Sequence, residues 1–233
     1  LCMLISSRIE RRSDMHKLIV EVGSLYKGGY MAKFYAVAKG KSGEGLILNS
    51  WEDCKKEVMG VKGAIYKSFA SKEEAKEFLN LHNNGKTDIK EEDLNSDMLY
   101  IYVDGSFMEA RGNYSFGLVA VKNGEVLHKD KGVGHEEHNR ALRNVAGEVL
   151  GAMKAVEYAL NNDYKEVTIC FDYQGIESWA LGTWQRNREL TKHYHHYMKE
   201  KMKNLKIYFK KIKGHSGDKY NDLADKLAKS ALE

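Results

Sequence analysis

Two aspartates follow apolar segments in a way that would bring their carboxylates together. Asp104 comes directly after the apolar run Leu99–Val103, and Asp172 comes directly after Glu166–Phe171. Both runs have the length and residue types of a buried strand. If the two strands pair in parallel, both carboxylates emerge at one edge of the sheet, the usual position for ligands in α/β folds.

Two further carboxylates lie on predicted helices. Glu148 is near the start of a helix expected over Asn144–Asn161, and small side chains continue from it: Gly151, Ala152, Ala155 and Ala159. Such a stripe lets a helix lie close to a sheet. Asp225 lies in a helix expected from about Lys219, whose apolar face consists of Leu223, Ala224, Leu227 and Ala228.

Clustered carboxylates repel one another and are costly to hold together unless a cation lies among them. Oxygen donors without cysteine favour Mg²⁺ or Mn²⁺. Two such ions about 3.5–4 Å apart can activate water and stabilise the leaving oxygen of a phosphodiester. A convergence of the four acids would therefore suit phosphodiester cleavage.

Each of the four acids also has an interpretation without chemistry. Asp104 and Asp172 could be turn residues at strand ends, and Glu148 could be a solvated helix residue. Asp225 could form an ion pair with Lys229, four residues later. Only their joint order along the chain favours a shared site.

The elements that would position these acids predict a mixed α/β layer fold over residues 98–233. After the first strand, a hairpin is expected from Tyr114–Val121 and Glu125–Lys131, because the Asn-Gly pair between them is a strong turn signal. The remaining elements are expected at about 174–182 (helix), 189–204 (helix) and Lys206–Ile212 (strand).

A smaller ββαβα unit is expected within residues 31–81. Ser50 should cap a helix that begins near Trp51. Ser71 and Glu74 form a capping box for the unit's last helix.

The segments that flank this unit differ from it in composition. Residues 82–97 carry five acids and two lysines, which indicates a linker. Residues 1–30 are expected to be an extension of unknown order, because the recognisable pattern begins only after Met31.

Bulk composition excludes several classes of protein. Of the 233 residues, 42% are hydrophobic and 30% are charged, a balance typical of a globular chain. The three cysteines (Cys2, Cys54 and Cys170) are far apart, which argues against a disulfide framework or zinc site and suits a reducing compartment. No apolar run approaches the ~18 residues of a membrane span. We expect a cytoplasmic monomer without membrane contact.

The segments around the four acids resemble those of the type 1 ribonuclease H family. YIYVDGS resembles the family's first catalytic strand, and RNVAGEVLGAMKAVEYA resembles the helix that carries its Glu. TICFDYQGI resembles the second catalytic strand, and KGHSG with NDLADKLA resembles the closing His loop and Asp helix. The resemblance implies a mixed five-stranded sheet flanked by helices. It also implies that Asp104, Glu148, Asp172 and Asp225 are catalytic and bind two Mg²⁺ ions, which Mn²⁺ can replace.

The resemblance assigns further roles near the acids. His215 resembles the mobile family histidine that shuttles protons or helps product leave, although a loop histidine is often simply exposed. Asn144 and Gln174 match positions that contact the minor groove of the hybrid, where the 2′-OH marks RNA. Their alternatives are helix capping for Asn144 and simple exposure for Gln174. Arg143 departs from the family, because several relatives use Thr there to hold a DNA phosphate.

The segment FYAVAKGKSGEGLILNSWEDCKKEV, with GAIYKSFAS after it, resembles the hybrid-binding domain, also called the viroplasmin or caulimovirus domain. By this resemblance Trp51 and Tyr66 stack on the DNA strand, Lys67 binds a phosphate, and Tyr35 supports the surface. Aromatic side chains next to lysines make a cationic, sequence-tolerant surface for nucleic acid. Alternatively, Tyr35 and Tyr66 are core residues of a small sheet.

Together these resemblances imply endonucleolytic hydrolysis of the RNA strand of RNA/DNA hybrids, with 5′-phosphate and 3′-hydroxyl ends. Residues 185–219 carry eleven Lys or Arg against three Asp or Glu, which would attract phosphates. One alternative is a non-catalytic hybrid-binding protein, which an Asp104→Asn variant would distinguish. Another is a resolvase or integrase on the same fold, which a panel of nucleic acid substrates would distinguish.

Overall fold

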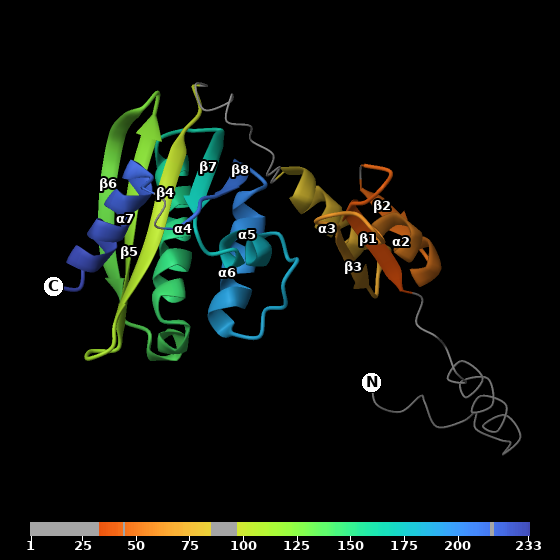
Figure 1. Ribbon diagram of the computed structural model, residues 1–233, viewed down its shortest axis with the longest axis horizontal. Helices are drawn as coiled ribbons and strands as arrows, with labels where there is room; N and C mark the ends of the chain where they lie inside the picture. Colours follow the sequence, from red (N-terminus) through yellow and green to blue (C-terminus); the bar gives the residue numbers. More distant parts are fainter. Residues whose placement is uncertain (1–32, 44, 85–96, 215–216) are drawn as a thin grey trace, which may run out of the picture.

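The computed structural model describes residues 33–43, 45–84, 97–214 and 217–233 (Figure 1). The predicted N-terminal extension, most of the predicted linker and His215 lie outside these described residues. Within the described part of the chain, no helix combines the length and apolar character that crossing a bilayer requires.

The N-terminal domain is a three-stranded antiparallel sheet with a helix on each face. Its strand order is β2-β1-β3. Alternate residues of β1 face opposite helices, because Ala36 packs with Phe78 of α3 and Val37 packs with Cys54 of α2. The elements are β1 (Phe34–Lys39), β2 (Leu46–Leu48), α2 (Trp51–Val58), β3 (Ile65–Phe69) and α3 (Lys72–Asn84).

Both predicted helix starts in this domain are confirmed. The Ser50 hydroxyl accepts a hydrogen bond from the backbone N–H of Asp53. The backbone N–H of Glu74 donates to the Ser71 hydroxyl, and the Glu74 carboxylate accepts from the backbone N–H of Ser71. Each cap satisfies backbone groups that the first turn of a helix leaves unpaired.

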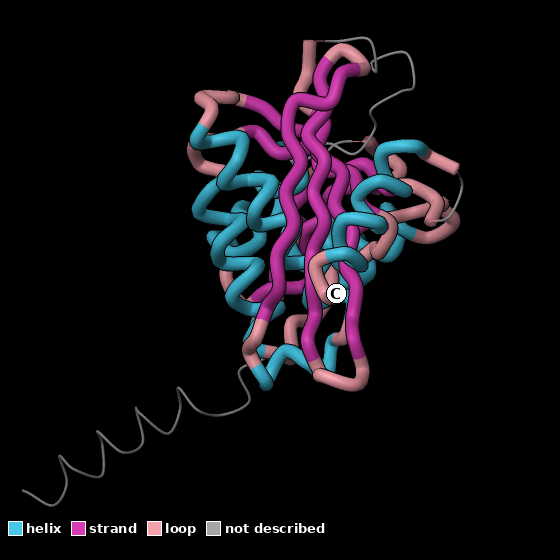
Figure 2. Tube along the Cα trace, turned by 90° about the vertical axis from the view of Figure 1, so that its left-hand side faces the viewer, coloured by secondary structure: helices cyan, strands magenta, loops and turns pink. Residues whose placement is uncertain are grey.

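The C-terminal domain is a mixed five-stranded sheet of order β6-β5-β4-β7-β8. β5 is antiparallel to both of its neighbours, β4 and β6, whereas β4, β7 and β8 run in parallel. Figure 2 shows helices on both sides of this sheet. The elements are β4 (Tyr100–Met108), β5 (Asn113–Lys122), β6 (Glu125–Gly134), α4 (Asn144–Asn161), β7 (Glu166–Phe171), α5 (Gly175–Ala180), α6 (Glu189–Lys201), β8 (Lys206–Lys211) and α7 (Lys219–Ser230).

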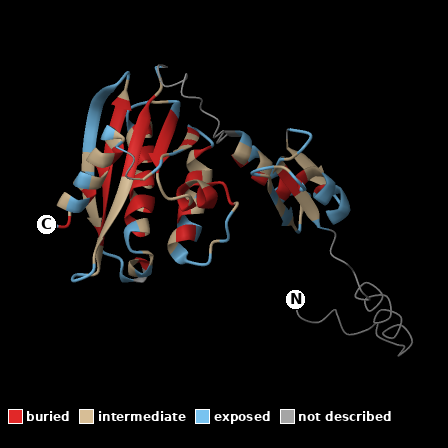
Figure 3. Ribbon diagram, in the orientation of Figure 1, coloured by how far each residue is buried: buried red, intermediate tan, exposed pale blue. Residues whose placement is uncertain are grey.

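The two faces of this sheet support two hydrophobic clusters. Ile101 and Val103 face the larger cluster with α4, whose inner face is buried (Figure 3). Tyr100 and Tyr102 face the smaller cluster, which includes Ala224 of α7. Alternation along one strand therefore fixes which helix covers which face.

Glycines allow the two helices to lie directly against the strands. A Cβ at Gly105 of β4 would lie 2.1 Å from the Asn144 carbonyl oxygen at the start of α4. A Cβ at Gly117 of β5 would lie 2.0 Å from the Ala224 carbonyl oxygen of α7. The strands that carry these glycines are paired, with Asp104 opposite Gly117. Both helices are thus held within backbone contact of the strand segment around Asp104.

Two sequence expectations about this domain need correction. The first strand was expected to end at Asp104, but β4 continues to Met108 because β5 pairs with it along that whole length. A 3-10 helix, Glu137–Leu142, precedes α4 and was not predicted. The Asn-Gly hairpin is confirmed, with φ of 52° at Asn123 and 78° at Gly124.

Candidate active site

Asp104 and Asp172 meet at the end of the parallel pairing between β4 and β7. The last parallel pair is Tyr102 with Cys170, and each aspartate follows that pair by two residues. The parallel arrangement on which a shared edge depends is therefore present. It places both carboxylates at the same edge of the β4–β7 pair.

Glu148 is held against the end of β7 by hydrogen bonds. Its side chain is only 2% exposed, and Oε1 accepts from the backbone N–H groups of Asp172 and Tyr173, both at 3.2 Å. Burial raises the pKa of Glu148, and the charges of Asp172 and Asp104 raise it further. Glu148 is therefore part of the cluster and not the solvated helix residue of the alternative interpretation.

Asp104 is affected by the charges of the other acids. Burial is the main cause that raises its pKa to about 7, and the charges of Asp172 and Asp225 raise it further. The backbone N–H of Gly105, 2.7 Å from Oδ1, and the charge of Lys229 act in the opposite direction. These couplings mean that the acids of β4, β7 and α7 share one electrostatic environment.

Asp225 forms the ion pair with Lys229 that the sequence offered as an alternative to a role in the site. Lys229 Nζ lies 2.7 Å from Asp225 Oδ2, and the Asp225 side chain is 24% exposed. The pair does not remove Asp225 from the cluster, because its charge still acts on Asp104. Lys229 is thus a protein cation at the edge of the acidic group.

The donor set fits a hard divalent cation. Asp104, Glu148, Asp172 and Asp225 offer oxygen atoms, which Mg²⁺ and Mn²⁺ prefer. Across the described ranges, no group of three or more His, Cys, Asp or Glu side chains already has metal-binding geometry. Asp104 and Glu148 nevertheless have raised pKa values, caused mainly by burial and partly by the charges of other acids in the cluster. A bound cation would relieve that repulsion.

The other predicted residues of this domain surround the cluster. A Cβ at Gly214 would lie 2.8 Å from Asp172 Oδ2, so the segment that precedes His215 touches the site. Asn144 is exposed at the first position of α4, and the N-cap is Arg143, which argues against the capping alternative. The Gln174 amide donates to Glu177 at 2.8 Å, so it is not simply exposed.

Sequence reasoning missed an aromatic cluster beside Asp172. Tyr173, Trp179 and Trp184 have ring centroids 5.6–6.1 Å apart. Trp184 is 41% exposed, which leaves a flat apolar surface at the edge of the site. The two tryptophans are five residues apart in the sequence, a signal that could have drawn attention to them.

The predicted aromatic surface of the N-terminal domain is present. The Trp51 ring centroid lies 5.9 Å from that of Tyr35 and 6.0 Å from that of Tyr66. Trp51 and Tyr66 are 41% and 45% exposed, so neither is an ordinary core residue, whereas Tyr35 is half-buried. Lys67 does not lie beside them, because its ammonium donates to the Gly182 carbonyl oxygen at 2.7 Å.

Comparisons with known proteins agree with this architecture. A sequence profile described as "Ribonuclease H1 N-terminal domain" matches residues 33–79, and one described as "RNase H" matches residues 96–233. The chain is 30% identical over 146 residues to a ribonuclease H of Pseudoalteromonas translucida, an alignment that covers 56% of this chain and 87% of the relative. It is 54% identical over 50 residues to a ribonuclease H of Saccharomyces cerevisiae, which covers 22% of this chain and 14% of the relative.

A solved structure shares the fold of the C-terminal domain. Ribonuclease H1 of Halobacterium salinarum matches with a TM-score of 0.50 and 20% identity, over 58% of this chain and 97% of that one. The profile match to RNase H extends over more than half of the sequence and includes all four acids. The chain therefore belongs to the ribonuclease H family.

Proposed function

We propose that this protein hydrolyses the RNA strand of RNA/DNA hybrids at the cluster of Asp104, Glu148, Asp172 and Asp225, with two divalent ions. The observation that carries the proposal is the arrangement of these acids. Asp104 and Asp172 follow the last β4–β7 pair, and Glu148 of α4 accepts from the Asp172 backbone. The charge of Asp225 on α7 acts on Asp104. Family membership and the N-terminal domain support the same substrate. The relatives in that family are themselves called ribonuclease H.

In this proposal, hydrogen bonds within the chain position the carboxylates at which the reaction takes place. The Gly105 N–H donates a hydrogen bond to one carboxylate oxygen of Asp104. Glu148 accepts a hydrogen bond from the Asp172 backbone N–H, which fixes the position of the backbone that carries the Asp172 side chain. Magnesium bound by the acids would supply an activated water and stabilise charge on the leaving 3′ oxygen. We expect products with 5′-phosphate and 3′-hydroxyl ends.

The surfaces around the acids suit a nucleic acid duplex. Exposed Trp184 offers a flat face for a sugar or base, and Trp51 and Tyr66 offer a second face on the other domain. We infer that the second face raises the local concentration of hybrid at the site through tethering. Asn144, exposed at the start of α4, is available to read a 2′-hydroxyl.

Digestion of a labelled RNA/DNA duplex tests the proposal. We expect Mg²⁺-dependent cleavage of the RNA strand, no cleavage of single-stranded RNA or a DNA four-way junction, and no cleavage by Asp104→Asn. Hybrid left intact by well-folded wild-type protein with Mg²⁺ or Mn²⁺ would overturn it. Hybrid binding by Asp104→Asn separates loss of chemistry from loss of substrate.

A further inference from the structure

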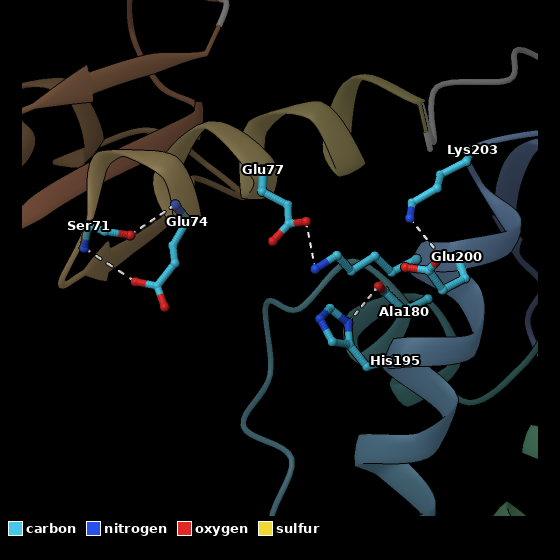
Figure 4. A network of polar contacts seen from close by, with 8 residues as sticks. Ser71, Glu74, Glu77, Ala180, His195, Glu200 and Lys203 are labelled. Atoms are coloured by element: carbon cyan, nitrogen blue, oxygen red, sulfur yellow. Dashed lines mark hydrogen bonds and ion pairs between the residues drawn. The ribbon is translucent and has the colours of Figure 1, made fainter. Parts of the chain in front are cut away.

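The two domains contact each other through the α3 side of the N-terminal domain. The Lys67 ammonium of β3 reaches the carbonyl oxygen of Gly182, which follows α5. The Glu77 carboxylate of α3 pairs with Lys199 of α6 at 2.6 Å (Figure 4). Leu81 of α3 packs into the main hydrophobic cluster of the catalytic domain. Among the described residues, polar and apolar contacts thus both join the domains.

The docking face and the aromatic surface adjoin along β3, an edge strand from which the flexible Lys67 side chain can reach either face of the sheet. Along β3 the burial alternates, so that Tyr66 is exposed whereas Lys67 and Phe69 are half-buried. Phe69 packs in the cluster under α3, and the Tyr66 ring lies tilted beside that of Trp51 at the start of α2. The docked module therefore keeps its aromatic surface open to solvent while its lysine faces the catalytic domain.

The Lys67 ammonium lies at the edge of a small cavity between the domains. The cavity has a volume of about 170 Å³, and its lining includes Arg186 and His195 of the catalytic domain. Burial, together with the nearby Arg186 charge, lowers the pKa of Lys67. A lysine committed to a carbonyl oxygen in this cavity cannot at the same time contact a phosphate on the module's surface.

We propose that this docking is a latch that competes with the hybrid for Lys67, an inference that rests on the proposed function and on the phosphate contact that the family resemblance implies for Lys67. In the docked form a hybrid meets Trp51 and Tyr66 but not the Lys67 ammonium. Full binding requires the latch to open, so the apparent affinity is reduced by the fraction of molecules that are open. The Glu77 and Lys199 side chains are 47% and 29% exposed, and ion pairs at such positions are weak enough for a ligand to displace.

A cross-linking experiment tests the docking itself. A zero-length carbodiimide reagent joins a carboxylate to an amine only where the two are in contact. In the full chain carrying Asp104→Asn, we expect a Glu77–Lys199 cross-linked peptide whose yield falls roughly threefold or more with saturating hybrid. The Asp97–Lys122 pair, at 3.1 Å, is the internal reference. A reference cross-link without the Glu77–Lys199 peptide would refute the docking.

A cycle of binding measurements tests the competition. In the same background, Glu77→Gln should lower the Kd for hybrid about two- to fivefold. The control is Glu125→Gln, an exposed acid of β6 at the sheet edge away from the docked module, which should leave the Kd unchanged. With Lys67→Met present, Glu77→Gln should have no effect.

Two outcomes would overturn the latch, and neither depends on catalysis. An equal gain in affinity from Glu77→Gln with and without Lys67 would show a general charge effect instead of competition. Cross-linking that hybrid leaves unchanged would show that binding does not open the interface. Failure of the proposed function would give a different result: wild-type protein would leave the hybrid uncut with Mg²⁺ while the Glu77–Lys199 peptide still forms.

Discussion

Gly147 and Gly151 lie one turn apart on the buried face of α4, but the space beside them differs. A Cβ at position 147 would lie 1.8 Å from the Ser115 carbonyl oxygen of β5. A Cβ at position 151 would meet its nearest atoms, in Val103 and Phe116, at 3.3 Å. Alanine should therefore destabilise the protein at position 147 but not at position 151.

The magnitudes follow from these distances. Both substitutions gain about 1 kcal/mol of helix propensity over glycine. At position 151 the neighbours need to move only a few tenths of an ångström, so Gly151→Ala should be about as stable as wild type or slightly more stable. At position 147 the helix must retreat by about 1.6 Å to reach ordinary contact, and such overpacking against backbone should cost about 3 kcal/mol net.

The displacement should also affect catalysis, because Glu148 follows Gly147 directly. The two hydrogen bonds from the Asp172 and Tyr173 backbone to Glu148, both 3.2 Å long, cannot survive a shift of that size. Misplacement of a catalytic group by about 1 Å costs roughly 100-fold in rate. We expect Gly147→Ala to lose about that factor in kcat, whereas Gly151→Ala should retain wild-type activity.

Urea unfolding in EDTA measures the stabilities, and cleavage of labelled hybrid at a temperature where both variants are folded measures kcat. Equal stability and equal activity of the two variants would show that α4 does not touch the β5 backbone. The close contact at Gly147 would then not be what positions Glu148.

Three further predictions concern the acids and the aromatic surface. Asp104→Asn should abolish cleavage and, in EDTA at pH 7, raise the free energy of unfolding by about 1–3 kcal/mol, because it removes a buried charge. The folded state raises the Asp104 pKa from 3.8 to about 7 and so binds the proton more tightly than the unfolded state. Urea titrations should therefore show that stability falls as pH rises from 4 to 7, and that this fall is smaller in the variant, where the raised pKa of Glu148 still contributes. Mg²⁺ should raise the melting temperature of wild type but not of Asp172→Asn, as scanning calorimetry would show; an equal rise would place the ion elsewhere. Trp51→Ala should raise the Kd for hybrid about tenfold with kcat at saturation unchanged, and an unchanged Kd in an anisotropy titration would contradict the role of this surface.

Local signals in the sequence predicted the elements well. The bounds of α4, Asn144–Asn161, match the expectation because helical periodicity and the small-residue stripe coincide there. The capping box at Ser71 and the Asn-Gly turn are decided by residues adjacent in the chain, so no tertiary information was needed. The parallel pairing that joins Asp104 to Asp172 was a condition of the shared-site hypothesis, and the sheet meets that condition.

Features that depend on distant backbone could not be predicted. Glycine at 105, 117 and 147 is visible in the sequence, but nothing local shows which carbonyl oxygen faces it. Lys67 and Gly182 are 115 residues apart, and strand alternation alone does not identify the partner of the buried face. The polar residues after Asp104 resemble a turn, and only pairing with β5 extends the strand through them.

The continuation of β4 beyond Asp104 has a consequence for cation binding. Because Asp104 lies opposite Gly117 within a continuous ladder, its backbone is already ordered before any ion arrives. Fixing the backbone of one residue costs about 1–2 kcal/mol in conformational entropy. For Asp104 this loss occurs when the hairpin folds, not when the ion binds. Hydrogen exchange at the Asp104 amide should therefore be slow even in EDTA, and the arriving ion should reorganise side chains and protons but not the chain itself.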